Sequence, residues 1–230
     1  MAVSKAPRRT SLHWPEAWRI VPSRFPPRGV FDRIASPDDL EALFAIESLT
    51  NARLRQELGQ LDLVPRARRV SGPGTQPIMA AFTHLNPDGS RFSDGSYGVF
   101  YAARALETAV AETMYHRARF MAATREPAMK LEMRCYRTAI EGRLHDLRKG
   151  WPTMLHPTDY GPPQALAREL RAAGSAGAVY PSVRHAGGEC VGVFHPDLIK
   201  PCVQAQHLIY SWDGERLSAQ YAVATLHTAD

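Results

Sequence analysis

The sequence has few cysteines and no long apolar run, and these two absences exclude several classes of protein. Its three cysteines, Cys135, Cys190 and Cys202, form an odd set without a CxxC pair, so neither a disulfide framework nor a cysteine zinc site is predicted. No run approaches the roughly 18 consecutive apolar residues of a membrane helix. The first residues, MAVSKAPRRT, also lack the apolar stretch of a secretory signal. We therefore expect a cytoplasmic protein that has reduced cysteines and no membrane partner.

The common signatures of nucleotide and hydrolase sites are missing as well. The chain contains no Walker phosphate loop, no GxGxxG after a strand, no HExxH and no GxSxG. Glu112 and His116 have the spacing of a helical metal-binding pair, but no third ligand can be placed beside them. No metal is therefore expected.

The composition is that of a chain that folds around a core. The sequence has 230 residues, of which 44% are hydrophobic and 22% charged, and this balance excludes wholesale disorder. The net charge is +5, and residues 1–70 supply most of it, since they hold 12 basic and 8 acidic residues, a difference of +4. Residues 1–15 are basic and show little periodicity, which predicts a flexible basic arm before one domain over residues 16–230.

Short strands and a few helices alternate along the rest of the chain. Helices are predicted at residues 36–58 (one helix or two), 105–120 and 164–173. Strands are predicted at residues 18–22, 98–103, 129–137, 143–147, 177–182, 188–194 and 199–212. Residues 65–98 are rich in Pro, Gly, Ser and Asp, and are expected to form a long irregular connection. This order of elements predicts a single α+β domain.

Two arginines are candidates for holding an anion. Arg91 lies in the turn DGSRFSDGSYG, where the backbone can fold closely around a bound group. Arg19 lies in an apolar strand, where a charge needs a partner. Together they could clamp a diphosphate, because guanidinium groups form forked hydrogen bonds. Each alone is more often part of a structural ion pair.

Other candidate residues lie along the central strand and helix. Glu112 and His116 share one face of the predicted helix, where a solvated or ion-paired role is the simpler alternative. Tyr97 and Tyr101 flank the preceding strand and could stack on a flat heterocycle, although packing in the core is commoner. Ser182 ends a strand in a turn, and no neighbouring base marks it as a nucleophile.

Four short motifs in order give the chain a resemblance to a known family. They are Trp18-Arg19, Ser90-Arg91-Phe92, Val99-Phe100-Tyr101 leading to Ala111-Glu112, and Pro181-Ser182 before Gly187-Gly188. Over roughly residues 16–200 the chain resembles the RES-domain proteins, the toxin halves of bacterial toxin–antitoxin modules. It departs from them at Trp18, where tyrosine is frequent, at Ser90, where glycine is frequent, and at Ser93, where asparagine is.

The resemblance implies a fold, a substrate and a set of site residues. The fold would be a mixed, mostly antiparallel sheet flanked by helices, similar to the ADP-ribosyltransferases. The substrate would be NAD, cleaved between nicotinamide and ribose, with ADP-ribose passed to a protein, to phosphate or to water. The residues carried over as catalytic are Glu112, Arg19 and Tyr101, and those carried over as NAD-binding are Arg91, Ser182, Tyr97 and His116.

The resemblance also implies a partner, and the residues leave other functions open. An antitoxin protein would occlude the site, and the oligomer would be a homodimer or a toxin–antitoxin hetero-oligomer. The alternative is a nucleic-acid-binding module that uses RARR at residues 66–69 and the basic arm, with affinity that falls steeply with salt. A non-catalytic interaction protein with a decayed site is a further alternative.

Overall fold

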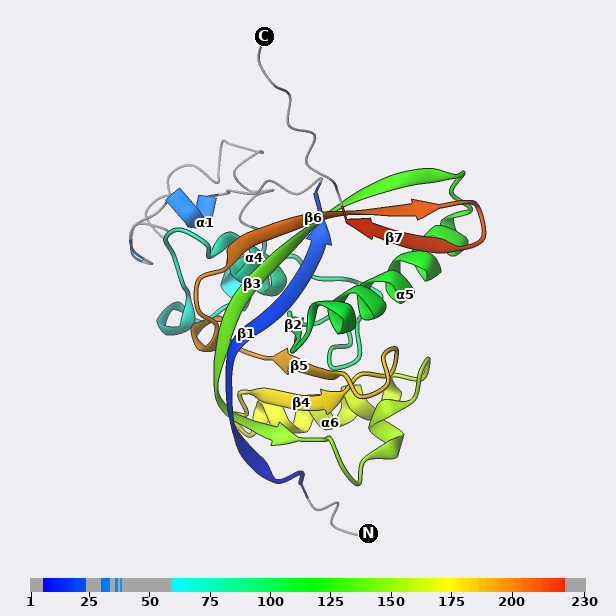
Figure 1. The fold of residues 1–230 in the computed structure, drawn as a ribbon. Coiled ribbons are helices and arrows are strands. Elements are labelled where there is room, and N and C mark those ends of the chain that lie inside the picture. The colour runs from blue at the N-terminus through cyan, green and yellow to red at the C-terminus, as the bar shows by residue number, and fades with distance from the viewer. Residues whose placement is uncertain (1–5, 24–29, 34–35, 37, 39–58, 222–230) are drawn as a thin grey trace.

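A computed structural model of the chain describes residues 6–23, 30–33, 36, 38 and 59–221 (Figure 1). The strands are β1 (Arg9–Pro22), β2 (Phe100–Ala103), β3 (Met129–Asp146), β4 (Gly177–Pro181), β5 (Glu189–Val193), β6 (Val203–Trp212) and β7 (Leu217–Tyr221). The helices are α1 (Val30–Arg33), α4 (Gln76–Thr83), α5 (Leu106–Thr124) and α6 (Gly161–Ala172). The predicted helix at residues 36–58 lies outside the described residues except for two positions. No helix among the described residues is long and apolar enough to cross a membrane.

The seven strands form one sheet in the order β1-β2-β5-β4-β3-β6-β7, and β1 also pairs with β3. This additional pairing closes a circuit of five strands, so the sheet curves back on itself (Figure 1). All pairs are antiparallel except β3 with β4. The prediction of one α+β domain with a mixed, mostly antiparallel sheet is confirmed.

The two faces of the sheet bury two separate hydrophobic clusters, because successive side chains of a strand point to opposite faces. One cluster joins Trp14 and Phe100 to Ile78 of α4. The other joins strand residues such as Tyr180 to Leu166 of α6, and α5 packs on it as well. Strand β2 contributes to both faces, since Phe100 belongs to the first cluster and Tyr101 packs against the second.

The N-terminal arm is shorter than predicted. We expected a flexible segment over residues 1–15, but β1 begins at Arg9 and its pairing with β3 begins at Arg9 opposite His145. The prediction is wrong from Arg9 onward, because Leu12 and Trp14 are buried in the first cluster. Pro15 lies at the register shift between Trp14 and Ala17, where a missing N–H is tolerated.

We predicted a long irregular connection over residues 65–98, and this prediction is wrong in part, because the segment contains a helix. The helix is α4, which begins with Gln76-Pro77, and proline suits the first turn of a helix. Ile78, Met79 and Phe82 of α4 are buried in the first cluster, and this packing stabilises a helix of only 8 residues. Strand β3 likewise joins two segments that were predicted as separate strands, residues 129–137 and 143–147.

Candidate functional site

Glu112 lies on the middle of α5 and is held by the turn that follows β4. The hydroxyl of Ser182 donates to Oε1 of Glu112 at 2.6 Å, and the backbone N–H of Val183 donates to the same oxygen at 3.2 Å. The Cys190 thiol is 3.9 Å from Oε1. No described residue donates to Oε2. The carboxylate is therefore fixed through one oxygen, which leaves the other for a ligand.

Ser182 uses its whole hydrogen-bonding capacity inside this turn. Its hydroxyl donates to Glu112 and accepts the backbone N–H groups of Arg184 at 3.1 Å and His185 at 3.0 Å. A hydroxyl has one donor and two lone pairs, so all three are engaged. The turn is also tied to α5 by a 2.8 Å contact between Thr108 Oγ1 and His185 Nδ1. This arrangement makes the turn a support for Glu112.

His116 lies one helical turn beyond Glu112 and is exposed. Partial desolvation lowers the pKa of His116, and the nearby charges of Arg184, Arg119 and Arg91 lower it further, against the opposing effect of Glu112. Arg184 stacks on the ring of Tyr115, with its guanidinium carbon 3.3 Å from the ring centroid. The lowered pKa keeps the imidazole neutral at neutral pH, so one ring nitrogen has a free lone pair, although the ring is a weaker base than an ordinary histidine.

Arg91 is buried, with 7% of its surface exposed, and its guanidinium is held by the segment before α6. Nη1 donates to the carbonyl oxygens of Met154 at 2.9 Å and His156 at 3.1 Å. The Tyr160 ring lies under the guanidinium carbon at 4.8 Å. These contacts engage Nη1, and the rest of the guanidinium can donate to an anion.

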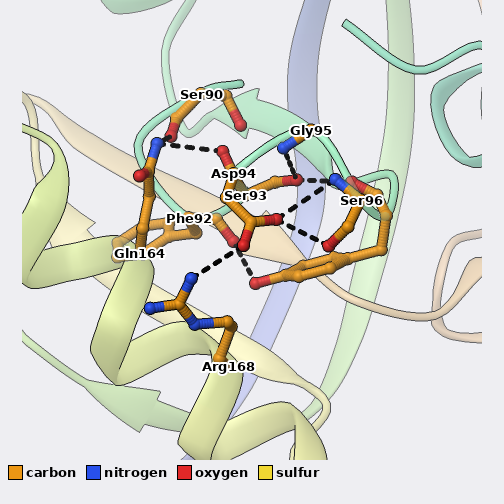
Figure 2. A network of polar contacts seen from close by, with 9 residues as sticks. Ser90, Phe92, Ser93, Asp94, Gly95, Ser96, Gln164 and Arg168 are labelled. Atoms are coloured by element: carbon orange, nitrogen blue, oxygen red, sulfur yellow. Dashed lines mark hydrogen bonds and ion pairs between the residues drawn. The ribbon is translucent and has the colours of Figure 1, made fainter. Parts of the chain in front are cut away.

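The turn that carries Arg91 is a compact polar structure, drawn in Figure 2. Gln164 Nε2 of α6 donates to the carbonyl oxygens of Ser90 at 2.9 Å and Ser93 at 3.1 Å. Arg168 of α6 forms an ion pair with Asp94 at 2.8 Å. Hydrogen bonds from Ser96, followed by that of Arg168, lower the pKa of Asp94 to about 2.

Tyr101 contacts the same turn from β2. Its hydroxyl accepts the backbone N–H of Phe92 at 2.8 Å and lies 2.9 Å from Ser90 Oγ. Its ring lies nearly parallel to that of Phe92, at 6.4 Å between centroids. Burial raises the pKa of the phenol well above its ordinary value, so the hydroxyl stays protonated. Tyr101 therefore reaches the turn through its hydroxyl.

The described structure brings most of the candidate residues together. The ring of Phe92, which follows Arg91, lies 5.0 Å from the ring of Tyr180, two residues before Ser182, so the turn of Arg91 lies near the turn that holds Glu112. Burial, and then Glu112, raises the pKa of the Cys190 thiol above its ordinary value. The resulting cluster of Arg91, Tyr101, Glu112, His116 and Ser182 is called the Glu112 site below.

Arg19 and Tyr97 are the two candidates that do not join the Glu112 site. Arg19 shares its face of the sheet with Phe100, whose ring lies 4.6 Å from the guanidinium carbon, and burial lowers its pKa. It reaches only the backbone of the site, because Nη1 donates to the Tyr101 carbonyl at 3.1 Å. Tyr97 is buried near α6, with its hydroxyl donating to the Phe92 carbonyl at 2.7 Å and burial raising its pKa to about 12.

Sequence reasoning missed the residues that support the site from elsewhere in the chain. Arg184 follows Ser182 by two positions, and its basic side chain next to the Pro-Ser turn is a signal that could have been used. Gln164 gave no signal, because a single polar residue at the start of a predicted helix is common. Its contact with Ser90 spans 74 positions of the chain.

Comparison with known proteins places this arrangement in context. A family model described as the RES domain matches residues 65–213, which include Arg91, Tyr101, Glu112 and Ser182 but not Arg19. This range begins and ends later than the 16–200 expected from the motifs. The protein named "Uncharacterized protein y4oC" of Sinorhizobium fredii is 34% identical over 214 residues, covering 90% of this chain and 87% of its own length. A chain of the crystal structure of the M. tuberculosis MbcT–MbcA toxin–antitoxin complex is 12% identical, with a TM-score of 0.43, and the match covers 85% of this chain and 86% of that chain.

Proposed function

Because the chain belongs to the RES domain family, we propose that it is an NAD-consuming toxin of a toxin–antitoxin pair. It cleaves the bond between nicotinamide and ribose and passes ADP-ribose to an acceptor. The observation that supports this most directly is the Glu112 carboxylate, fixed through Oε1 by Ser182 and Val183 and unbonded at Oε2 among the described residues. A fixed negative charge is what a reaction with a cationic sugar intermediate requires.

The proposed reaction moves one pair of electrons at each stage. The bond between the nicotinamide ring nitrogen and ribose C1′ breaks, and its electron pair leaves with nicotinamide, which becomes neutral. The ribose then carries the positive charge of an oxocarbenium ion, which Glu112 stabilises. A lone pair of the acceptor forms the new bond to C1′, and the acceptor loses a proton. Removal of one such electrostatic contact costs about 10²–10³ in rate in other enzymes.

Arg91 and His116 have separate proposed tasks. Arg91 holds the diphosphate of NAD through the part of its guanidinium that is not bonded to Met154 and His156. His116, with its lowered pKa, accepts the proton that the acceptor loses. The acceptor itself is a protein side chain, phosphate or water.

An enzyme that depletes NAD must be restrained in the cell that makes it. The partner we propose is an antitoxin that fills the Glu112 site. Arg91, Arg119 and Arg184 give this site an excess of positive charge over the single carboxylate. An acidic or polar segment of the antitoxin would therefore complement it.

Product analysis of the purified protein with NAD tests this proposal. Mass spectrometry would follow nicotinamide and ADP-ribose in plain buffer, in phosphate buffer and with cell lysate. Glu112→Ala is the test variant, and Glu107→Ala is the matched control, because Glu107 is an exposed glutamate in the first turn of the same helix. Nicotinamide release that is lost in Glu112→Ala and kept in Glu107→Ala is the expected result.

The fate of ADP-ribose separates the acceptors. Free ADP-ribose indicates hydrolysis, its phosphorylated form indicates phosphorolysis, and a mass increase on a lysate protein indicates transfer to a protein. Absence of nicotinamide under all three conditions, with no antitoxin bound, would contradict the proposal.

A further inference from the structure

The backbone on both sides of Arg91 is held by one amide side chain from α6. Gln164 Nε2 donates to the carbonyl oxygen of Ser90, which precedes Arg91, and to that of Ser93, two residues after it (Figure 2). A primary amide has two N–H groups, and both are used here. The Gln164 side chain therefore links the two ends of the turn, one on each side of Arg91.

The turn is packed closely around the Gln164 amide. The Ser90 N–H donates to the Ser93 carbonyl at 2.7 Å, so that oxygen accepts from the turn and from Gln164 together. A Cβ added at Gly89 would lie 2.6 Å from the Ser93 oxygen and 3.1 Å from Gln164 Nε2. Close backbone packing and the amide contact thus define a single shape for the turn.

The position of Arg91 depends on this shape because its side chain is confined. Only 7% of Arg91 is exposed, and Met154, His156 and Tyr160 hold its guanidinium. A buried arginine cannot compensate for a shifted backbone by adopting another extended rotamer. A movement of the turn therefore moves the guanidinium away from its anion or from its carbonyl partners.

We infer that Gln164 is a positioning residue that sets Arg91 for binding the diphosphate of NAD. This inference rests on the proposed function for the identity of the anion, and on the geometry of the turn for the role of Gln164. Gln164 touches neither Glu112 nor Ser182 among the described contacts, so its loss affects substrate binding and leaves the bond-breaking step nearly unchanged.

The kinetic test compares two contacts between α6 and the same turn. Gln164→Leu keeps the approximate volume and removes both donors, whereas Arg168→Met removes the exposed ion pair with Asp94. Gln164→Leu should raise KM for NAD at least fivefold and change kcat less than twofold. Arg168→Met should leave both within twofold. An unchanged KM in Gln164→Leu, or an equal rise in Arg168→Met, would overturn the inference.

A double-mutant cycle shows whether the effect acts through Arg91. With Arg91→Met as the background, Gln164→Leu should raise KM no further, because the group that it positions is absent. Additive effects of the two substitutions would exclude the positioning role. If Gln164→Leu lowers the melting temperature substantially, Gln164→Met, which keeps the length of the side chain, replaces it in the cycle.

Hydrogen exchange without NAD separates this inference from the proposed function. The Ser90 amide should exchange at least tenfold faster in Gln164→Leu than in the wild type, and at the wild-type rate in Arg168→Met. Equal protection in all three proteins would mean that Gln164 does not hold the turn. Suppose the wild type leaves NAD intact, but Gln164→Leu still speeds the exchange of the Ser90 amide. This result would contradict the NAD proposal and keep the positioning role of Gln164.

Discussion

The hydroxyl of Ser182 lies 2.6 Å from Oε1 of Glu112, although the two residues are 70 positions apart in the chain. Two further donors, the N–H groups of Arg184 and His185, saturate the Ser182 oxygen from its own turn. The expectation from the resemblance was that Ser182 binds NAD directly. Its geometry favours a different role, in which the serine orients the carboxylate.

Ser182→Ala should therefore lower kcat more than it changes KM. The variant leaves Oε1 of Glu112 with the Val183 N–H and removes a hydrogen bond to a charged group, a contact worth about 1.5–3 kcal/mol. A loss of at least about 1.4 kcal/mol in the transition state corresponds to a tenfold or greater decrease in kcat. Steady-state nicotinamide release measures both constants. A raised KM with unchanged kcat would instead assign Ser182 to direct NAD binding.

Arg91 and Arg19 should respond differently to the same substitution. Arg91→Met should weaken NAD binding at least tenfold, because it removes the anion-binding guanidinium. Arg19→Met should change the affinity less than twofold, because the Arg19 guanidinium lies on the face of Phe100, away from the Glu112 site. Isothermal titration calorimetry with a Glu112→Gln background prevents turnover during the measurement. Equal weakening by both substitutions would return Arg19 to the NAD-binding set.

The pH dependence of kcat/KM should show an acidic limb that belongs to His116. Its pKa is lowered from the ordinary 6.5, so the neutral imidazole that accepts a proton persists below that value. The rate should fall as the pH falls through the lowered pKa, and His116→Asn should lower the plateau and remove this limb. In the interval below 6.5 the unfolded chain binds more protons than the folded one, so stability also decreases as the pH falls there. A limb that persists in His116→Asn would assign it to another group.

Gly98→Ala should destabilise the fold strongly. A Cβ at this position would lie 2.3 Å from the Ala81 carbonyl oxygen and 2.3 Å from the Phe82 Cα, which are backbone atoms of α4 that cannot move separately. Overpacking of this kind costs about 1–3 kcal/mol or more in the free energy of unfolding. Gly142→Ala is the control, because its nearest neighbour is a Leu198 methyl at 3.4 Å. Chemical denaturation should distinguish them, and equal stabilities would contradict the close approach of α4 to β2.

The sequence by itself determined most of the local structure. Segments with a regular alternation or a helical period, such as those of β2, α5 and α6, lie within a few residues of their predicted positions. These elements depend on side chains within a few residues of one another, which is why a pattern can indicate them. The resemblance to the RES-domain proteins, carried by the order of four motifs, also provided Arg91, Tyr101, Glu112 and Ser182 as candidates.

Only the tertiary structure decided which face of the sheet each candidate occupies and what supports it. Arg19 and Arg91 both looked suited to an anion, but the pairing of Trp18 with Ala103 places Arg19 on the face opposite Tyr101. A shift of one residue in that pairing would have reversed the face. Gln164 bonds to the backbone on both sides of Arg91 only because α6 packs beside the turn. Register and packing arise from contacts between distant segments, and such contacts are set by the burial of whole elements rather than by any local pattern.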